Sequence, residues 1–265
     1  MNDFVEDFID SFGYRVNYCI WGSKGPKLVI LHSMGMDSHS MDALCESFKN
    51  ECQILALTIL DHGDSDTPIR PIPVDEHAEI MRLCYLKLGF SPNVLLGHSI
   101  GGRMGMILSA EYVQEIKGLI LVDIAPTSQS PSYRVPMQRK DSFKDEDEVR
   151  SFIRSCYPSM SEYYVENRVR YGFRVDDGKL TQKLIGDIIR AAPWVDLWPY
   201  VSRITCPALL ILGEKSTLVA PETLDRLKKL MVGLNVETIK DASHMVPQDR
   251  PEDFEKVVKQ FLHLH

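Results

Sequence analysis

Residues 97–101 read Gly-His-Ser-Ile-Gly, a pattern that can present a serine hydroxyl for nucleophilic attack. The apolar run at 93–97 predicts a buried strand before it, and residues 101–110 predict a helix after it. A serine between a strand and a helix lies on a sharp turn, so the residues two before and two after it must lack bulk. Both are glycines here, and Gly102 allows close helix packing. This context predicts Ser99 as a nucleophile rather than as part of a glycine-rich loop.

A serine hydroxyl needs a base to become nucleophilic at neutral pH, and the base needs an orienting carboxylate. In proteins with this turn, the acid and then the histidine follow the serine along the chain. Three histidines follow Ser99, and His263 and His265 lie in the terminal tail. His244 lies between the last predicted strand and the last predicted helix. The sequence therefore predicts His244 as the base.

The orienting acid has more than one candidate. In proteins with this turn, the acid usually lies in the loop after the strand predicted at 208–212. Ser216 stands there instead of an aspartate. Asp123 ends the strand that follows the nucleophile helix, and a carboxylate there can reach the same imidazole nitrogen. We predict Asp123 as the acid, with Glu214 and then Asp241 as alternatives. The structural alternative for Asp123 is a cap of the turn beside Pro126.

Attack on a carbonyl group creates an oxyanion, which needs hydrogen-bond donors aimed in advance. We expect the first donor to be the backbone N–H of Ile100, at the start of the nucleophile helix. The second should be the backbone N–H of Met34, in the loop after the predicted strand 27–31. His32 and His98 flank the site, and we expect them to brace loops rather than to transfer protons.

The composition predicts a globular protein and argues against two classes of partner. The chain has 265 residues, 44% hydrophobic and 25% charged, which is ordinary for one α/β domain. A net charge of -7 argues against nucleic acid or an anionic membrane as a partner. We expect no signal peptide, no membrane span, no metal and a cytoplasmic monomer or homodimer. We also expect reduced thiols at the six scattered cysteines, Cys19, Cys45, Cys52, Cys84, Cys156 and Cys206.

Strands and helices are predicted to alternate along most of the chain, which favours a mostly parallel sheet covered on both faces. The alternation stops at 127–200, a more polar stretch with helical patterns near 146–157, 161–171 and 181–192. We therefore expect a core of residues 1–126 and 201–265, with residues 127–200 inserted as a helical cap.

Three motifs together resemble the α/β-hydrolase superfamily, and within it the small bacterial carboxylesterase branch. They are Gly-His-Ser-Ile-Gly-Gly at 97–102, Val-Asp-Ile-Ala-Pro at 122–126 and His-Gly-x-Ser at 62–65. The resemblance implies an eight-stranded α/β-hydrolase fold, a helical cap after strand six, ester hydrolysis and no cofactor. An acid after the sixth strand also occurs in some haloalkane dehalogenases of this superfamily.

This chain departs from the family pattern at three positions. Ser33 replaces a glycine that usually follows the histidine after the third strand, which changes the oxyanion loop or adds a hydroxyl donor to it. Leu60 stands where an arginine is common, and Ser216 replaces the usual acid. The first two bear on the substrate class, and the third bears on the identity of the acid.

The predicted activity is hydrolysis of a small, fairly apolar carboxylic ester, thioester or lactone through an acyl-enzyme on Ser99. We expect Ser33, Trp194 and Trp198 to contact the substrate, with further cap aromatics at Phe143 and Tyr163, although cap core is the alternative for each aromatic. Carbon–carbon bond hydrolysis of a ring-fission product would use the same three residues. Two further alternatives on the same fold are a cofactor-independent dioxygenase and a ligand-binding receptor with little turnover.

Overall fold

The computed structural model describes residues 4–92, 94–127 and 140–264. At its centre lies an eight-stranded sheet. The second strand in spatial order is antiparallel to both of its neighbours, and the third to the eighth strands pair in parallel. Asn93 and His265, which the sequence analysis places in a strand and in the tail, lie outside the described residues. In spatial order the strands are β1 (Phe4–Ser11), β2 (Tyr14–Trp21), β4 (Gln53–Leu57), β3 (Lys27–Leu31), β6 (Val94–His98), β7 (Gly118–Val122), β11 (Ala208–Gly213) and β12 (Leu234–Ile239).

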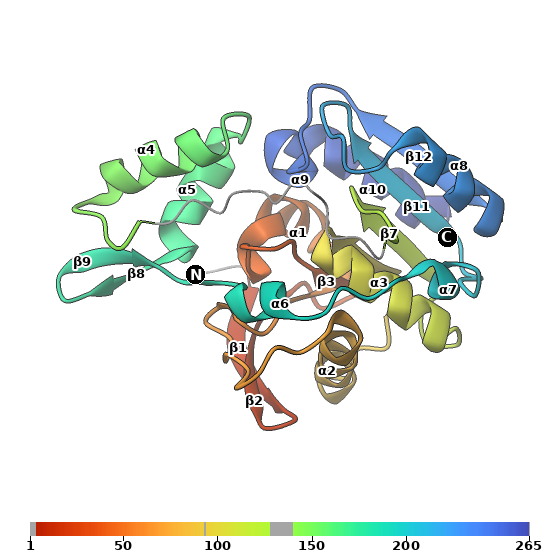
Figure 1. Cartoon of the computed structure of the whole chain (residues 1–265), viewed down its shortest axis with the longest axis horizontal. Helices are drawn as coiled ribbons and strands as arrows, with labels where there is room; N and C mark the ends of the chain where they lie inside the picture. Colours follow the sequence, from red (N-terminus) through yellow and green to blue (C-terminus); the bar gives the residue numbers. More distant parts are fainter. Residues whose placement is uncertain (1–3, 93, 128–139, 265) are drawn as a thin grey trace.

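Helices cover both faces of the sheet (Figure 1). On one face, α1 (Asp42–Phe48) and α10 (Pro251–Leu264) bury apolar side chains such as Phe48 and Phe254. On the other face, α2 (Val74–Lys87), α3 (Ile100–Glu111) and α8 (Pro221–Leu230) do the same. Because both faces are covered, β3, β4, β6 and β7 read as continuous apolar runs rather than alternating ones. Each fully buried Leu, Ile or Phe contributes about 1.5–3 kcal/mol to folding.

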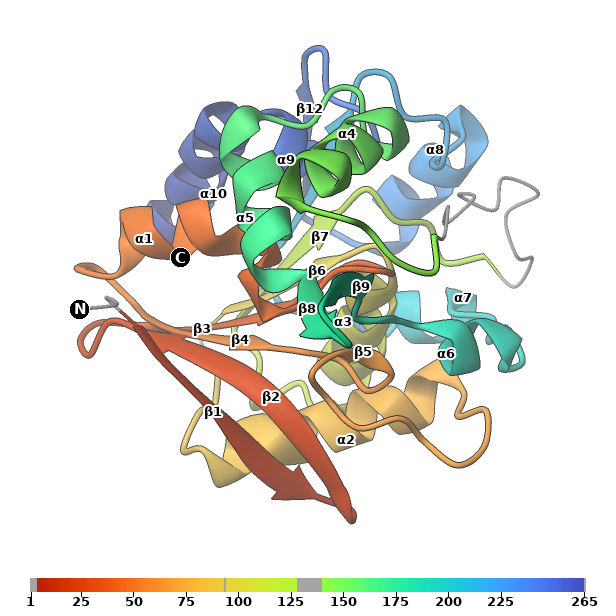
Figure 2. The same cartoon turned by 90° about the vertical axis from the view of Figure 1, so that its left-hand side faces the viewer.

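The segment after β7 carries its own small apolar core. It contains α4 (Glu146–Cys156), α5 (Glu162–Tyr171) and the hairpin of β8 (Phe173–Asp176) and β9 (Lys179–Gln182). Figure 2 shows α4 and α5 standing above the sheet on the side that faces the viewer. Their shared core, separate from the two that flank the sheet, consists of Phe143, Val149, Ile153, Met160, Tyr164, Val165, Val169 and Phe173.

The end of the insertion packs differently. It runs through β10 (Leu184–Ile185), α6 (Asp187–Ala191) and α7 (Trp198–Val201). Ile189, Leu197 and Val201 belong to the apolar core shared with α2 and α3, rather than to the core of α4 and α5. These two apolar cores divide the cap that we propose for residues 127–200. An outer part lies around α4 and α5, and an inner part packs against the sheet domain.

The prediction of a helix over residues 181–192 is wrong for its first half. Asp177 and Gly178 both have positive φ, 46° and 71°, and form the tight turn between β8 and β9. An Asp-Gly pair of this kind is a strong hairpin signal, so residues 179–182 continue as a strand. Leu184 and Ile185 then pair with His62 and Gly63 of β5 (His62–Gly63). Only α6 remains of the expected helix.

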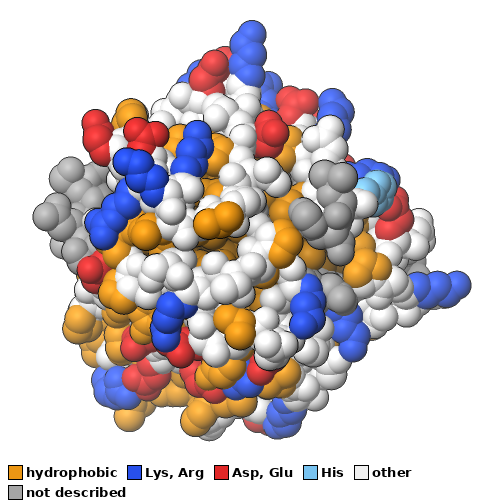
Figure 3. Space-filling model, turned by 90° about the vertical axis from the view of Figure 1, so that its right-hand side faces the viewer, with side chains coloured by type: hydrophobic (Ala, Val, Ile, Leu, Met, Phe, Trp, Pro, Cys, Tyr) orange, Lys and Arg blue, Asp and Glu red, His pale blue; other side chains and the backbone are white. Residues whose placement is uncertain are grey.

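Charge is dispersed on the surface around β12 and the C-terminal helix. On the face shown in Figure 3, basic and acidic side chains are interspersed among apolar and neutral ones. Within the described residues, no helix combines the length and the apolar character needed to cross a bilayer.

Candidate active site

Ser99 lies on a strained turn between β6 and α3. Its φ and ψ are 52° and -113°, a region that non-glycine residues seldom occupy. Its backbone N–H donates to Val122 O at 3.0 Å, and its own carbonyl accepts from Arg103 N at 3.0 Å. The residue is half-buried, so the turn holds Ser99 accessible at the carboxyl edge of the sheet.

The two glycines of the motif make this turn possible. A Cβ on Gly97 would lie 2.3 Å from Gly101 O, and a Cβ on Gly101 would lie 2.2 Å from Leu31 O. Both contacts are with backbone atoms, which cannot move aside cheaply. The strand, the turn and the helix therefore approach so closely that only glycine fits at these positions.

The structure brings His244 and Asp123 into contact. His244 Nδ1 lies 2.6 Å from Asp123 Oδ2, and Asp123 is almost fully buried at the end of β7. Since a carboxylate accepts hydrogen bonds, Nδ1 is the donor, which leaves Nε2 of the neutral ring as an acceptor. The Ser216 hydroxyl donates to the same Oδ2 at 2.6 Å. Ser216, which stands where the usual acid would be, thus binds the acid on the neighbouring strand.

The alternative acids lie elsewhere. Glu214 Oε2 accepts the backbone N–H of Asp241 at 2.9 Å. Asp241 is exposed and its carboxylate forms ion pairs with Lys215 and Arg250 at 3.2 Å and 3.7 Å. Of the three candidate acids, Asp123 is the one in hydrogen-bond contact with His244.

The loop that carries His244 is fixed from two sides. His98, the residue before Ser99, donates from Nε2 to His244 O at 2.9 Å, and the two rings are 5.1 Å apart. Burial holds the pKa of His98 well below its usual range, so this ring stays neutral. On the other side, Asp249 accepts from both the backbone N–H and the hydroxyl of Ser243, at 2.8 Å and 2.6 Å. As expected, His98 contacts a loop backbone, and it does so beside the nucleophile.

The loop after β3 contacts the nucleophile helix directly. Gly101 N–H donates to His32 O at 3.2 Å. The His32 ring links two loops, because Nδ1 lies 2.7 Å from Ser33 O and Nε2 accepts the Ile59 N–H at 2.9 Å. Burial lowers the pKa of His32 to about 4, which keeps this arrangement neutral. These contacts hold the predicted oxyanion loop, with Ser33 and Met34, against the start of α3.

His62, the first residue of the His-Gly-x-Ser motif, has a position for which the sequence predicted no role. The ring of His62 is fully buried, and its Nδ1 contacts Leu60 O at 3.0 Å. A Cβ on Gly186 would lie 2.4 Å from His62 Nε2 and 2.5 Å from Met34 Sδ. Gly186 therefore lets β10 of the cap pass directly over the predicted oxyanion loop. The clue in the sequence is a glycine inside the predicted helix 181–192, but its partner cannot be read from the chain.

The two tryptophans predicted to contact substrate lie at different places. Trp194 stacks on the buried guanidinium of Arg103, 4.1 Å from the ring centre, and its Nε1 donates to Thr127 O at 2.6 Å. Arg103 also donates to the carbonyls of Thr127 and Val195, and burial lowers its pKa to about 10. Trp198 packs instead on Arg226 of α8, with the guanidinium 3.8 Å from its ring.

The two further cap aromatics lie in opposite environments. Phe143 is buried in the core of α4 and α5, as cap core would be, whereas Tyr163 on α5 is 45% exposed.

A family model described as alpha/beta hydrolase fold matches residues 26–177. This match covers more than half of the chain, and the sheet order, the turn at Ser99 and the insertion after β7 agree with it. The chain therefore belongs to the α/β-hydrolase superfamily.

Among curated proteins, sn-1-specific diacylglycerol lipase ABHD11 of Mus musculus is 25% identical over 258 residues, which cover 89% of this chain and 81% of the lipase. The 2-(acetamidomethylene)succinate hydrolase of Mesorhizobium japonicum is 23% identical over 246 residues, covering 90% of this chain and 88% of that protein. Both are relatives at low identity, and their substrates differ from one another.

Solved structures agree on the fold. The crystal structure of E-2-(acetamidomethylene)succinate hydrolase matches with a TM-score of 0.90 at 23% identity, covering 98% of this chain and 99% of that one. An esterase from Mycobacterium tuberculosis matches with a TM-score of 0.83 at 20% identity, covering 98% and 91%. At these identities the likeness establishes the fold alone.

Proposed function

We propose that the protein is a serine hydrolase that cleaves a small, fairly apolar carboxylic ester, thioester or lactone through an acyl-enzyme. The observation that carries this proposal is the hydrogen bond of 2.6 Å between His244 Nδ1 and Asp123 Oδ2, at the edge of the sheet where the strained turn presents Ser99. A neutral imidazole held in this tautomer offers Nε2 to a hydroxyl proton.

In the proposed mechanism, Ser99 Oγ attacks the carbonyl carbon while His244 Nε2 takes its proton. Asp123 stabilises the imidazolium that forms, and the backbone N–H groups of Ile100 and Met34 stabilise the oxyanion. Collapse of the tetrahedral intermediate breaks the bond to the leaving group, which takes the proton from His244. Water then attacks the acyl group on Ser99, with His244 again as the base, and releases the acid.

The inferred substrate class rests on the apolar side chains around the turn. Ile100 follows Ser99 directly, and Met34 of the predicted oxyanion loop packs against the same apolar cluster as Ile100. Ser33 is buried, and its hydroxyl is without a hydrogen-bond partner within the described residues. We assign this hydroxyl to the substrate or to the oxyanion. The six cysteines are free thiols, which supports our assignment to the cytoplasm.

A fluorophosphonate probe followed by turnover of p-nitrophenyl esters of increasing chain length tests the proposal. We expect stoichiometric labelling, loss of labelling in Ser99→Ala, and turnover under anaerobic conditions with a preference for short chains. Turnover that requires oxygen would indicate a dioxygenase. A folded protein that is neither labelled nor active would indicate a binding role.

A further inference from the structure

A second group of reactive side chains lies beneath the N-terminal hairpin. Glu6 of β1 and Cys19 of β2 are directly opposite each other in the antiparallel register. The short helix η1 (Ser38–Met41) places His39 against this pair. Glu6 Oε1 lies 3.5 Å from His39 Nε2, Cys19 Sγ lies 3.6 Å from the same nitrogen, and all three ligand atoms fall within 4.8 Å of one another.

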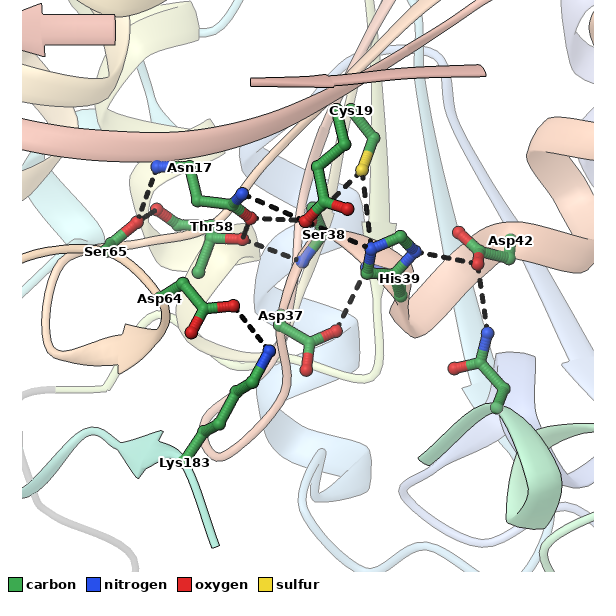
Figure 4. Close-up of polar contacts among 12 residues, drawn as sticks. Asn17, Cys19, Asp37, Ser38, His39, Asp42, Thr58, Asp64, Ser65 and Lys183 are labelled. Carbon is green, nitrogen blue, oxygen red and sulfur yellow. Dashed lines mark hydrogen bonds and ion pairs between the residues drawn. The ribbon is translucent and has the colours of Figure 1, made fainter. Parts of the chain in front are cut away.

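The ring of His39 is oriented by a carboxylate. Its Nδ1 lies 2.9 Å from Asp42 Oδ2, so Nδ1 donates and Nε2 points to the sulfur. Figure 4 shows Cys19 and Asp42 on opposite sides of the His39 ring. A carboxylate that holds one ring nitrogen while the other binds an ion is the recurrent outer shell of histidine metal sites.

The remaining ligand atoms also have partners that fix them. Asn17 Nδ2 donates to Glu6 Oε1 at 3.1 Å, and Ser38 Oγ lies 3.5 Å from Cys19 Sγ. Asp42 Oδ2 in turn accepts from Asn167 Nδ2 of α5 at 3.0 Å. The group is thus preorganised from the hairpin, from η1 and from the cap.

We propose that Glu6, Cys19 and His39 form a binding site for a divalent transition metal of the Zn²⁺ class. Tetrahedral zinc has bonds of about 2.3 Å to sulfur and about 2.0–2.2 Å to nitrogen and oxygen, which sets the ligand atoms about 3.4–3.6 Å apart. The separations of 3.5 Å and 3.6 Å from His39 Nε2 match this spacing. The sequence predicted no metal, because its eight histidines are dispersed along the chain.

The chemistry of the three ligands selects the kind of ion. A thiolate and an imidazole favour zinc, copper or similar ions over Mg²⁺ and Ca²⁺, which prefer oxygen. The Glu6 side chain is 36% exposed, whereas that of His39 is 4% exposed, so an ion enters from the side of Glu6 and solvent supplies the fourth ligand there.

The same residues do not make a second nucleophile. Cys19 is fully buried in the middle of β2, and burial raises the pKa of its thiol. A bound ion would take the place of the thiol proton, because the thiolate is the form of cysteine that binds a metal.

An ion at this site would join three parts of the molecule. His39 stacks face to face on Tyr171 of α5, with ring centres 3.5 Å apart. One turn earlier in α5, the buried Arg168 pairs with Asp37 at 3.3 Å. Both contacts link the cap to the segment that continues the predicted oxyanion loop. The ion would thus fix the outer cap to the hairpin, independently of the chemistry at Ser99.

The first test measures binding to the full chain. Equilibrium dialysis against Zn²⁺ after treatment with a chelator should give one bound ion per chain. Bound Co²⁺ should show a sulfur-to-cobalt charge-transfer band and the intense visible bands of a tetrahedral site. Cys19→Ser should lose the charge-transfer band, whereas the matched control Cys84→Ser, at a cysteine buried on the other side of the sheet, should retain it. Substoichiometric binding, or a band that survives in Cys19→Ser, would overturn the proposal.

The second test substitutes the partly exposed ligand and compares it with a buried residue of the outer shell. Glu6→Gln changes a partly exposed side chain, and we expect it to weaken binding of Co²⁺ by at least as much as Asp42→Asn. Loss of an outer-shell carboxylate typically lowers metal affinity roughly 10–100-fold. Unchanged affinity in Glu6→Gln would show that the cluster is a hydrogen-bond network of the hairpin and binds no ion.

Discussion

Two histidine–aspartate pairs among the described residues have nearly the same local geometry. His244 Nδ1 lies 2.6 Å from Asp123, and His39 Nδ1 lies 2.9 Å from Asp42. The His244 side chain is 18% exposed, whereas that of His39 is 4% exposed. In both pairs the carboxylate accepts from Nδ1 and turns Nε2 toward another partner. What differs is the partner and its access to solvent.

The partner determines the chemistry of each pair. Near His244, the turn at Ser99 has φ 52° and presents a half-buried hydroxyl at the sheet edge. Beside His39, Cys19 lies in regular strand structure with no exposed surface. The first pair thus borders the partly exposed hydroxyl that we propose as the nucleophile, whereas the second borders a fully buried thiol. A histidine–aspartate pair alone is therefore weak evidence of catalysis.

Removal of the nucleophile should have the largest effect. We predict that Ser99→Ala lowers kcat roughly 10⁵–10⁶-fold, as loss of the nucleophile does in well-studied serine hydrolases. Hydrolysis of p-nitrophenyl acetate measures this loss. Ser109→Ala, a buried serine on the same helix, is the matched control and should retain turnover and probe labelling. Full activity in Ser99→Ala would refute the assignment.

Substitution of Asp123 should affect the His244 pair and leave the His39 pair unchanged. Asp123→Asn should lower kcat by about 10⁴, because an amide stabilises the wrong tautomer and cannot stabilise the imidazolium. The same variant should bind Co²⁺ with the affinity of the parent. Glu214→Gln is the control and should stay close to the parent in turnover, and the reverse result would identify Glu214 as the acid.

A third histidine, His77, shows how burial changes the pKa of a ring that no carboxylate contacts. His77 is fully buried, neither ring nitrogen has a hydrogen-bond partner within the described part of the chain, and burial lowers its pKa to about 4. Between about pH 6.5 and pH 4 the His77 ring is protonated in the unfolded chain and neutral in the folded chain. The free energy of unfolding therefore decreases as the pH is lowered through this range. From pH 7 to pH 5 this one residue should cost about 2 kcal/mol.

Urea unfolding of the parent and of His77→Leu at pH 7 and pH 5 measures that contribution. The variant should lose about 2 kcal/mol less than the parent over this interval, whatever its stability at pH 7. Identical losses in the two proteins would mean that His77 is protonated in the folded state.

Ser216→Ala should have the smallest effect. The hydroxyl donates to the same oxygen of Asp123 that binds His244, and a hydrogen bond to a charged group contributes about 1.5–3 kcal/mol when it is fully buried. Because Ser216 is only partly buried, we expect kcat to fall roughly 10-fold with little change in KM. A change in KM alone would indicate that Ser216 contacts substrate instead. Ser216→Asp combined with Asp123→Asn should recover part of the activity that Asp123→Asn loses.

The sequence predicted the strands of the eight-stranded sheet and the turn at Ser99 because each depends on residues close together in the chain. The contact of Asp123 with His244 could be predicted because parallel strands bring their carboxyl ends to one edge. The Glu6–Cys19–His39 group could not, since it depends on the register of a hairpin and on where η1 docks. The passage of Gly186 over His62 depends in the same way on long-range packing.

Arg103 has a consequence for how the insertion can vary. Its guanidinium binds the carbonyls of Thr127 and Val195, so the start and the end of the insertion meet at one point of α3. For a loop whose ends are already held together, each doubling of length costs only about 0.6 kcal/mol in closure entropy. The segment between these two residues can therefore be exchanged or lengthened without moving the helix that follows Ser99.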